Sequence, residues 1–454
     1  MLRQRRKKLA KNDNLEGDDM IRSIERAAMR KVYVRLLPIA VLTYFFCYLD
    51  RINVSFAALT MNKDLGLDAT MFGFAGGAFF WGYFIFEVPS NLILEKVGAR
   101  LWIARIMVTW GLLSGATALC TGPYSFLAVR FLLGVAEAGF FPGLVLYFTY
   151  WFPDHHRARI LSGFTLALPV AVMLGAPMST ALMELDGFRH LAGWQWLYLS
   201  EAVPTVLLGV VVLFFLTDRP AEARWLGDDE RAWLVATLAE ERRRIEAQRK
   251  FSFWESLWDA KVLLLALNYL GVVTASIGML QFVPQIIKQL GFANMQVGLL
   301  TMIPYFCGSV AMLVWGWVSD RTGERRFNLC AACVLATAGL ALAASSVGTL
   351  WVLVGLSVAA AGFYGSKGPF WAMPSMFLTG SASAAGIAWI NSIGNLGGSI
   401  GPSIVGRLKD LTGGFAAGLY ALAAFALLAA VVAAIGLRIP RAGTARKPVA
   451  IAAE

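Results

Sequence analysis

The chain has 454 residues, 58% hydrophobic and only 15% charged, whereas a soluble domain has about a quarter of its residues charged, so an ordinary soluble protein is excluded. The formal charge of +11 does not indicate nucleic-acid binding, because basic residues gather in an N-terminal arm and in short loops between apolar runs. The five cysteines lie in or beside apolar runs and exclude a disulfide framework.

Residues 1–35 form this arm, which is basic and polar and lacks the short apolar segment and cleavage site of a secretory signal. The first apolar run begins near Leu36, is of full length and contains Asp50 and Arg51. We therefore predict a span that is retained in the protein. The positive-inside rule places the arm in the cytoplasm.

Twelve apolar runs follow one another along the chain, and each approaches the roughly 20 residues that cross a bilayer. They lie near 37–58, 70–91, 101–120, 124–147, 160–182, 196–216, 262–286, 297–318, 328–346, 350–373, 384–405 and 415–437. The polar stretch 217–260 separates six runs from six, a pattern typical of parallel repeats in transporters. The sequence predicts an all-α integral membrane protein with two pseudo-symmetric six-helix bundles.

The predicted organisation has five parts and places both termini in the cytoplasm. They are a basic arm at 1–35, a first bundle at 36–216, a cytoplasmic linker with a surface helix at 217–260, a second bundle at 261–437 and a cytoplasmic tail at 438–454.

A loop motif recurs at the same place in each predicted bundle. The loop after the second run reads EKVGAR at 95–100, and the loop after the eighth reads DRTGER at 320–325. The repeat of an acid-base pair, a glycine and an arginine resembles the loop signature of the major facilitator superfamily, although the first copy lacks the leading glycine. The resemblance implies gating or structural roles for Asp320, Arg321 and Arg325.

Ionisable side chains inside the predicted spans are candidate functional residues, because a charge at bilayer depth is expensive. Arg130 and Glu137 are seven residues apart, about 10 Å along one helix face. With Asp50 and Arg51 they should converge near the middle of the membrane. The other two ionisable candidates are Glu87, near the cytoplasmic end of its helix, and Lys367.

The chemistry of the four converging residues differs. Arginine stays charged and cannot carry protons, but it binds carboxylates through paired hydrogen bonds. A buried acid whose desolvation is balanced by a nearby arginine can load and release protons near neutral pH. The alternative, that the charges only pair with one another, is favoured for Glu87, which we place near the loop arginines. For Lys367, substrate contact and gate pairing both stay open.

Polar and aromatic side chains at similar depth complete the predicted substrate site. In the first bundle, Tyr44, Tyr48 and Arg51 are spaced to share a helix face. The other predicted contacts are Tyr83 in the first bundle and Gln281, Trp371, Asn391 and Asn395 in the second. This asymmetry favours proton coupling in the first half and substrate contacts in the second.

Seven stretches spread over nearly the whole chain resemble the anion:cation symporter family of this superfamily. They are residues 48–57, 86–91, 130–143, 218–220, 284–286, 368–371 and 391–395. The family contains bacterial proton symporters for sugar acids, tartrate, phthalate-type acids and 4-hydroxyphenylacetate, together with vesicular organic-anion carriers.

The resemblance implies that Asp50 and Glu137 are the proton-coupling acids and that Arg51 and Arg130 contact the substrate anion. We expect a monomer in the bacterial inner membrane that imports a small organic acid by alternating access. Protons would be the coupling ion, with no other cofactor, no metal and no nucleic-acid partner.

Other classes fit the sequence less well. GGSIG at 397–401 matches the GxSxG motif of hydrolases, but it lies in an apolar run rather than a strand–turn–helix, so we do not predict an enzyme. No phosphate-binding GxxxxGK[ST] loop occurs. A proton-coupled exporter of the same fold remains the alternative. The glycine-rich motif of such exporters, aligned on Pro177, has other residues at four glycine positions, which favours uptake.

Overall fold

The computed structural model describes residues 2–165, 167–247, 258–376 and 380–436, which form helices joined by turns and loops and contain no strand. The helices are α1 Leu2–Asp64, α2 Ala69–Val97, α3 Ala99–Ala116, α4 Pro123–Glu137, α5 Phe140–Thr149, α6 Asp154–Thr165, α7 Ala167–Met183, α8 Gly193–Phe215, α9 Asp228–Ala247, α11 Ala260–Lys288, α12 Asn294–Thr322, α13 Arg325–Ser345, α14 Trp351–Ala372, α15 Gly380–Thr412 and α16 Ala416–Val431.

Each of the twelve predicted runs contains helix, and the predicted all-α architecture is confirmed. Within the described residues, ten helical segments are long and apolar enough to cross a membrane. The two remaining helices are α14, which carries Lys367, and α15, which is rich in glycine and serine. The number of crossings and the side of the termini stay predictions, and the predicted tail at 438–454 lies outside the described residues.

The fourth predicted run is two helices rather than one. After α4 ends at Glu137, Ala138 is extended and Gly139 has φ 85, a left-handed conformation that glycine adopts readily. A Cβ at Gly139 would lie 2.4 Å from the Ser90 hydroxyl oxygen of α2, so glycine is needed for the close approach as well. The break places Glu137 at the end of a helix in the centre of the first bundle.

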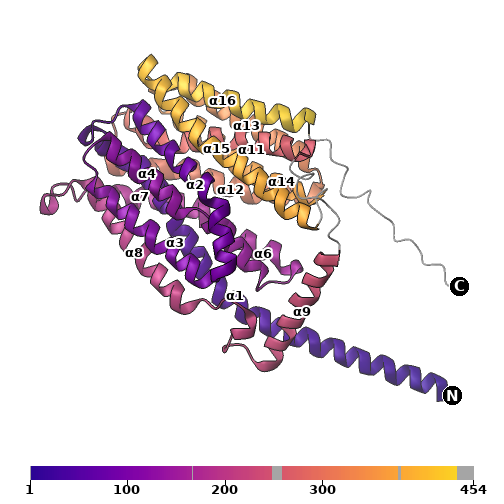
Figure 1. The fold of residues 1–454 in the computed structure, drawn as a ribbon. Coiled ribbons are helices and arrows are strands. Elements are labelled where there is room, and N and C mark those ends of the chain that lie inside the picture. The colour runs from indigo at the N-terminus through magenta and orange to yellow at the C-terminus, as the bar shows by residue number, and fades with distance from the viewer. Residues whose placement is uncertain (1, 166, 248–257, 377–379, 437–454) are drawn as a thin grey trace.

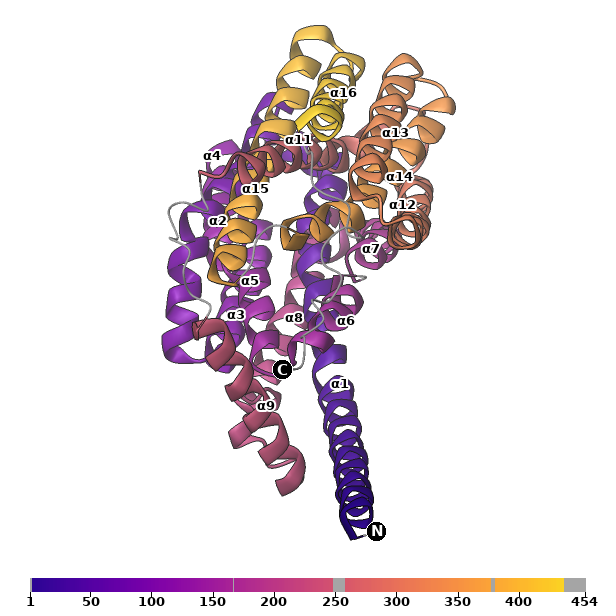
Figure 2. The ribbon, with the colours of Figure 1, turned by 90° about the vertical axis from the view of Figure 1, so that its right-hand side faces the viewer.

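The two bundles meet most closely through α2 and α15, which run side by side in both views (Figures 1 and 2). Small residues allow the contact: a Cβ at Gly73 would lie 2.3 Å from the Pro402 carbonyl oxygen. At the end of the pair, the carboxylate of Asp410 accepts hydrogen bonds of 2.6 Å from both the backbone N–H and the hydroxyl of Thr70. The second bundle therefore caps the start of a first-bundle helix.

The predicted surface helix of the linker is present as α9, which lies beside α1 at the end of the molecule where the N-terminal arm projects (Figure 1). Lys31 of α1 pairs with Glu230 at 2.8 Å, and Arg157 of α6 pairs with Glu241 at 2.7 Å. The linker helix is thus bound to the first bundle by ion pairs.

The second copy of the loop motif makes a tight turn between α12 and α13. Gly323 has φ 66, and the Asp320 and Arg325 side chains form a 2.6 Å ion pair across the turn. The guanidinium of Arg321 lies 5.2 Å from the Trp317 ring instead. The structural role predicted for these three residues is consistent with these contacts.

In the first copy of the loop motif, the arginine pairs with an acid from outside the motif. Gly98 has φ 101, and the partner of Arg100 is Asp218, from the start of the linker. The Asp218 carboxylate accepts a 2.8 Å hydrogen bond from the backbone N–H of Arg100, and a side-chain nitrogen lies 3.6 Å away. The linker therefore begins on the loop motif of the first bundle.

Candidate substrate and proton sites

A cavity lies between the bundles and is lined by both. Its first-bundle residues are Tyr48, Arg51 and Phe80; those of the second bundle are Asn268, Tyr269, Val272, Val273, Ser276, Ile277, Phe363, Ser366, Lys367, Phe370, Trp371 and Asn395. Four predicted substrate contacts, Tyr48, Arg51, Trp371 and Asn395, are among them. Aromatic and amide groups with two cations make the cavity suited to a small polar anion.

Arg51 joins the cavity to the buried carboxylate of Glu137. Two guanidinium nitrogens, Nη2 and Nε, lie 2.5 and 2.6 Å from Oε1 of Glu137, which is 1% exposed. Cys47 donates from its thiol to the same oxygen at 3.2 Å. The second oxygen, Oε2, is buried without a hydrogen-bond partner among the described residues. Charge neutralisation at Glu137 would therefore free Arg51 for another anion.

Aromatic rings hold Arg51 from the other sides. The guanidinium carbon lies 5.2 to 5.4 Å from the centroids of Tyr48, Phe79 and Tyr83. Cation–π contact of this kind stabilises a partly desolvated cation. Tyr83, a predicted substrate contact, acts here on Arg51 and is not part of the cavity wall.

Asp50 is enclosed by neutral donors rather than by an arginine. Its oxygens accept hydrogen bonds from Trp110 Nε1 at 2.6 Å, Ser114 Oγ at 2.8 Å, Thr205 Oγ1 at 3.2 Å and Asn53 Nδ2 at 3.4 Å. The structure gives it no ion pair within the described part of the chain. The four converging charges therefore do not form one paired cluster.

Sequence reasoning missed one buried acid, Glu201 of α8. It is 2% exposed and accepts 3.0 Å hydrogen bonds from Asn53 Nδ2 and Ser179 Oγ. Because Asn53 also donates to Asp50, one amide links the two acids. Glu201 lies inside the predicted run 196–216, so the rule that singled out Asp50 and Glu137 could have found it.

Arg130 is buried on α4, with 4% of its surface exposed. Its guanidinium carbon lies 5.3 Å from the Phe79 ring, and its Nε has no hydrogen-bond partner in the described residues. It does not line the cavity. Its predicted contact with substrate therefore requires another conformation or stays indirect.

Two further predicted contacts pack inside the protein. Tyr44 stacks on Phe164 with ring centroids 4.2 Å apart. Gln281 of α11 donates a 3.2 Å hydrogen bond to the backbone carbonyl of Phe72 in α2. Neither lines the cavity, and the Gln281 bond joins the two bundles.

The surroundings of Glu87 differ from those predicted from the sequence. This residue was predicted near the loop arginines, but its buried carboxylate accepts 3.2 Å hydrogen bonds from Asn391 Nδ2 and Ser392 Oγ of α15. That prediction of position is wrong, because the packing of α2 on α15 directs the carboxylate toward the second bundle. Asn391, predicted as a substrate contact, holds Glu87 across the interface and does not line the cavity.

Lys367 of α14 lies on the cavity wall opposite the first bundle. Its ammonium nitrogen is 5.2 Å from the Tyr364 ring centroid, and no acid pairs with it among the residues that the structure describes. Within the described cavity lining, Arg51 and Lys367 are the two cations, and they come from different bundles.

Comparison with known proteins assigns the fold to a family. The model of the Major Facilitator Superfamily matches residues 40–402. A protein named "Putative tartrate transporter" from Agrobacterium vitis is 51% identical over 409 residues, 90% of this chain and 94% of the relative. A "Quinolone resistance transporter" from Acinetobacter baumannii is 42% identical over 399 residues, 88% of this chain and 92% of the relative.

A solved structure has a similar fold. The xylose transporter XylE from E. coli aligns with a TM-score of 0.71 at 14% identity, over 90% of this chain and 99% of that one.

Proposed function

The chain belongs to the Major Facilitator Superfamily, and from this premise we propose that it imports a small organic acid anion together with protons. It is a multi-pass membrane transporter rather than an enzyme, as the sequence predicted. The observation that carries the proposal is the position of Arg51, which lines the cavity and is paired with the buried Glu137.

Glu137 and the substrate carboxylate compete for one guanidinium. In the proposed cycle, a proton taken up on Glu137 removes the charge that holds Arg51, and the substrate carboxylate binds in its place. The halves then rock about the site, and substrate and protons leave on the other side. Asp50, enclosed by neutral donors, carries a second proton.

Protons also supply the electrical driving force. An anion moving toward a negative interior costs about 2.3 kcal/mol per charge per 100 mV. Two protons carried with a dianion move no net charge across the membrane. Two protons carried with a monoanion move one positive charge inward, which a negative interior favours. Two proton-carrying acids are therefore sufficient for either charge of substrate.

Two cations on the cavity wall favour a diacid. Arg51 would bind one carboxylate and Lys367 the other, from opposite bundles. The name of the relative from Agrobacterium vitis, a tartrate transporter, supports this substrate class because tartrate has two carboxylates. The second candidate, proton-coupled export, is favoured by the name of the quinolone resistance relative.

Proteoliposomes test the proposal. Adding tartrate outside should alkalinise the outside medium in vesicles that contain the protein, and Glu137→Gln should abolish this signal. Glu184→Gln, which replaces an exposed carboxyl of the same bundle, is the matched control. Alkalinisation that persists in Glu137→Gln would contradict the role of Glu137. Proton efflux driven by a quinolone, with no response to organic acids, would favour the exporter.

A further inference from the structure

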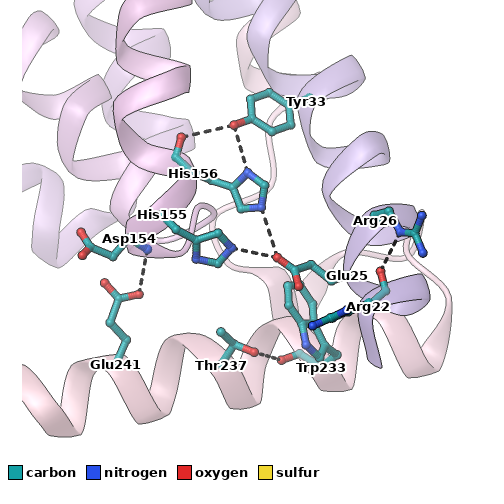
Figure 3. Close-up of polar contacts among 10 residues, drawn as sticks. All are labelled: Arg22, Glu25, Arg26, Tyr33, Asp154, His155, His156, Trp233, Thr237 and Glu241. Atoms are coloured by element: carbon teal, nitrogen blue, oxygen red, sulfur yellow. Dashed lines mark hydrogen bonds and ion pairs between the residues drawn. The ribbon is translucent and has the colours of Figure 1, made fainter. Parts of the chain in front are cut away.

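Outside the central site, three metal-ligating side chains converge where the N-terminal arm meets the first bundle (Figure 3). Glu25 comes from α1, and His155 and His156 come from the first turn of α6. The chain contains three histidines in all. Two of them therefore gather on one carboxylate, which is an unusual use of a rare residue.

The distances suit a metal site. The Nε2 atoms of His155 and His156 lie 2.8 and 3.5 Å from the same oxygen, Oε1 of Glu25. One ligand atom from each residue lies within 4.8 Å of the others. In a tetrahedral zinc site with bonds near 2.0 to 2.1 Å, neighbouring ligand atoms are roughly 3.4 Å apart. Small side-chain rotations would bring the three atoms to that spacing.

A second layer of contacts orients the partly buried imidazole of His156. The Tyr33 hydroxyl lies 3.3 Å from Nδ1 of His156 and donates to the His156 carbonyl at 3.2 Å. With the ring proton on Nδ1, that N–H donates to the Tyr33 oxygen and the lone pair of Nε2 faces Glu25. Metal-binding histidines are held in this way, with the non-ligating nitrogen bonded to a fixed partner.

An ordinary ion pair explains this arrangement less well. One protonated imidazole on Glu25 would suffice for a salt bridge, but the two rings have centroids 4.4 Å apart. Two positive imidazoles at that distance repel each other. A divalent cation removes the conflict because it binds both rings in the neutral form. The His155 side chain is 60% exposed, which leaves a path for the ion and a water.

We propose that Glu25, His155 and His156 bind a divalent transition metal of the Zn²⁺ class, with water as the fourth ligand. Two imidazoles and a carboxylate are a common protein ligand set for zinc. The bound ion would join α1 to α6. Because Arg157 and the backbone of Asp154 also contact Glu241 of α9, it would strengthen the attachment of the linker helix as well.

Metal binding to the full-length protein tests the site without any transport assay. The protein is purified in detergent with a histidine-free affinity tag, treated with Zn²⁺, freed of excess metal and analysed for zinc per chain. Wild type should retain about one equivalent more than His155→Gln, His156→Gln and Glu25→Gln. His190→Gln, which replaces the third histidine in another loop, should retain the wild-type amount.

Co²⁺ provides an independent readout, because tetrahedral coordination by nitrogen and oxygen gives visible absorption bands. These bands should appear in the wild type and in His190→Gln and be absent from His156→Gln. Tyr33→Phe keeps all three ligands and should weaken zinc binding about tenfold. Metal-free thermal melting checks that each variant is folded. Equal zinc retention in wild type and the ligand variants, or none in the wild type, would overturn the proposal.

Discussion

The two bundles differ in the charges that they place inside the membrane region. Among the described residues, the first contains the buried acids Asp50, Glu87, Glu137 and Glu201, together with the buried Arg130 and the partly exposed Arg51. The second presents Lys367 to the cavity among aromatic and amide groups. Proton exchange needs groups that change charge, whereas substrate binding needs a fixed charge and a fitted surface. This difference in charge is the one expected if proton coupling takes place in the first bundle and both bundles contribute to substrate selection.

The largest effect is expected from Arg51→Ala, because Arg51 serves both sides of this comparison. Removing it leaves Glu137 as an uncompensated buried charge, which destabilises a protein by about 3 to 5 kcal/mol. Substrate binding, measured by thermal shift with tartrate, should be lost. The double variant Arg51→Met/Glu137→Met should recover stability but not binding. Retained tartrate binding in Arg51→Ala would contradict its role as the anion anchor.

The variants Asp50→Asn and Glu201→Gln compare two buried acids within the first bundle. Replacing the Asp50 carboxylate removes charge-assisted hydrogen bonds from Trp110 and Ser114, each worth about 1.5 to 3 kcal/mol. Proton-driven uptake should fall by more than about tenfold, a change of about 1.4 kcal/mol, while substrate counterflow persists. Glu201→Gln, farther along the Asn53 link, should have the smaller effect. Equal loss in both variants would make the two acids one coupling unit.

Lys367→Met tests the contribution of the second bundle. Losing one of two charged contacts should weaken diacid binding about tenfold or more, since hydrogen bonds to charged groups contribute roughly 1.5 to 3 kcal/mol. Binding of the matching monoacid should change little. Lys409→Met, a lysine of the same bundle at the far end of α15, is the control. Equal weakening for mono- and diacids would indicate a general electrostatic effect instead.

The smallest effect is expected at Asp410, beyond the predicted span 384–405. Burial raises the pKa of this carboxyl, but hydrogen bonds from Thr70 and Ala69 outweigh burial, so its pKa lies below the usual value. The stabilisation is therefore present above the ordinary aspartate pKa and is lost as the pH falls through the lowered one.

Asp410→Asn should lower the melting temperature slightly at neutral pH, because an anion at a helix N-terminus contributes about 0.3 to 1 kcal/mol. The difference in melting temperature between this variant and the wild type should disappear at acidic pH. Glu184→Gln is the exposed control. A gap that is independent of pH would show that the charge of Asp410 does not hold the α2 contact.

Much of the fold followed from the sequence, because span length, apolarity and the loop motif are local properties. The candidate site followed in part. Arg51, Trp371 and Asn395 do line the cavity, whereas Gln281 and Asn391 bind the opposite bundle instead. Helical spacing predicts which residues share a face, but it does not predict which neighbour that face meets.

By itself, the sequence determined the helical membrane fold, the superfamily and the presence of costly charges inside the spans. Only the tertiary structure decided how those charges are paired: Arg51 with Glu137, Asp50 with Trp110, and Glu87 with the second bundle. It also placed Glu25 beside His155, which lies 130 positions away in the chain. Hydrophobicity is encoded residue by residue, whereas a hydrogen bond between distant segments depends on helix rotation, on breaks such as that at Gly139 and on close glycine contacts.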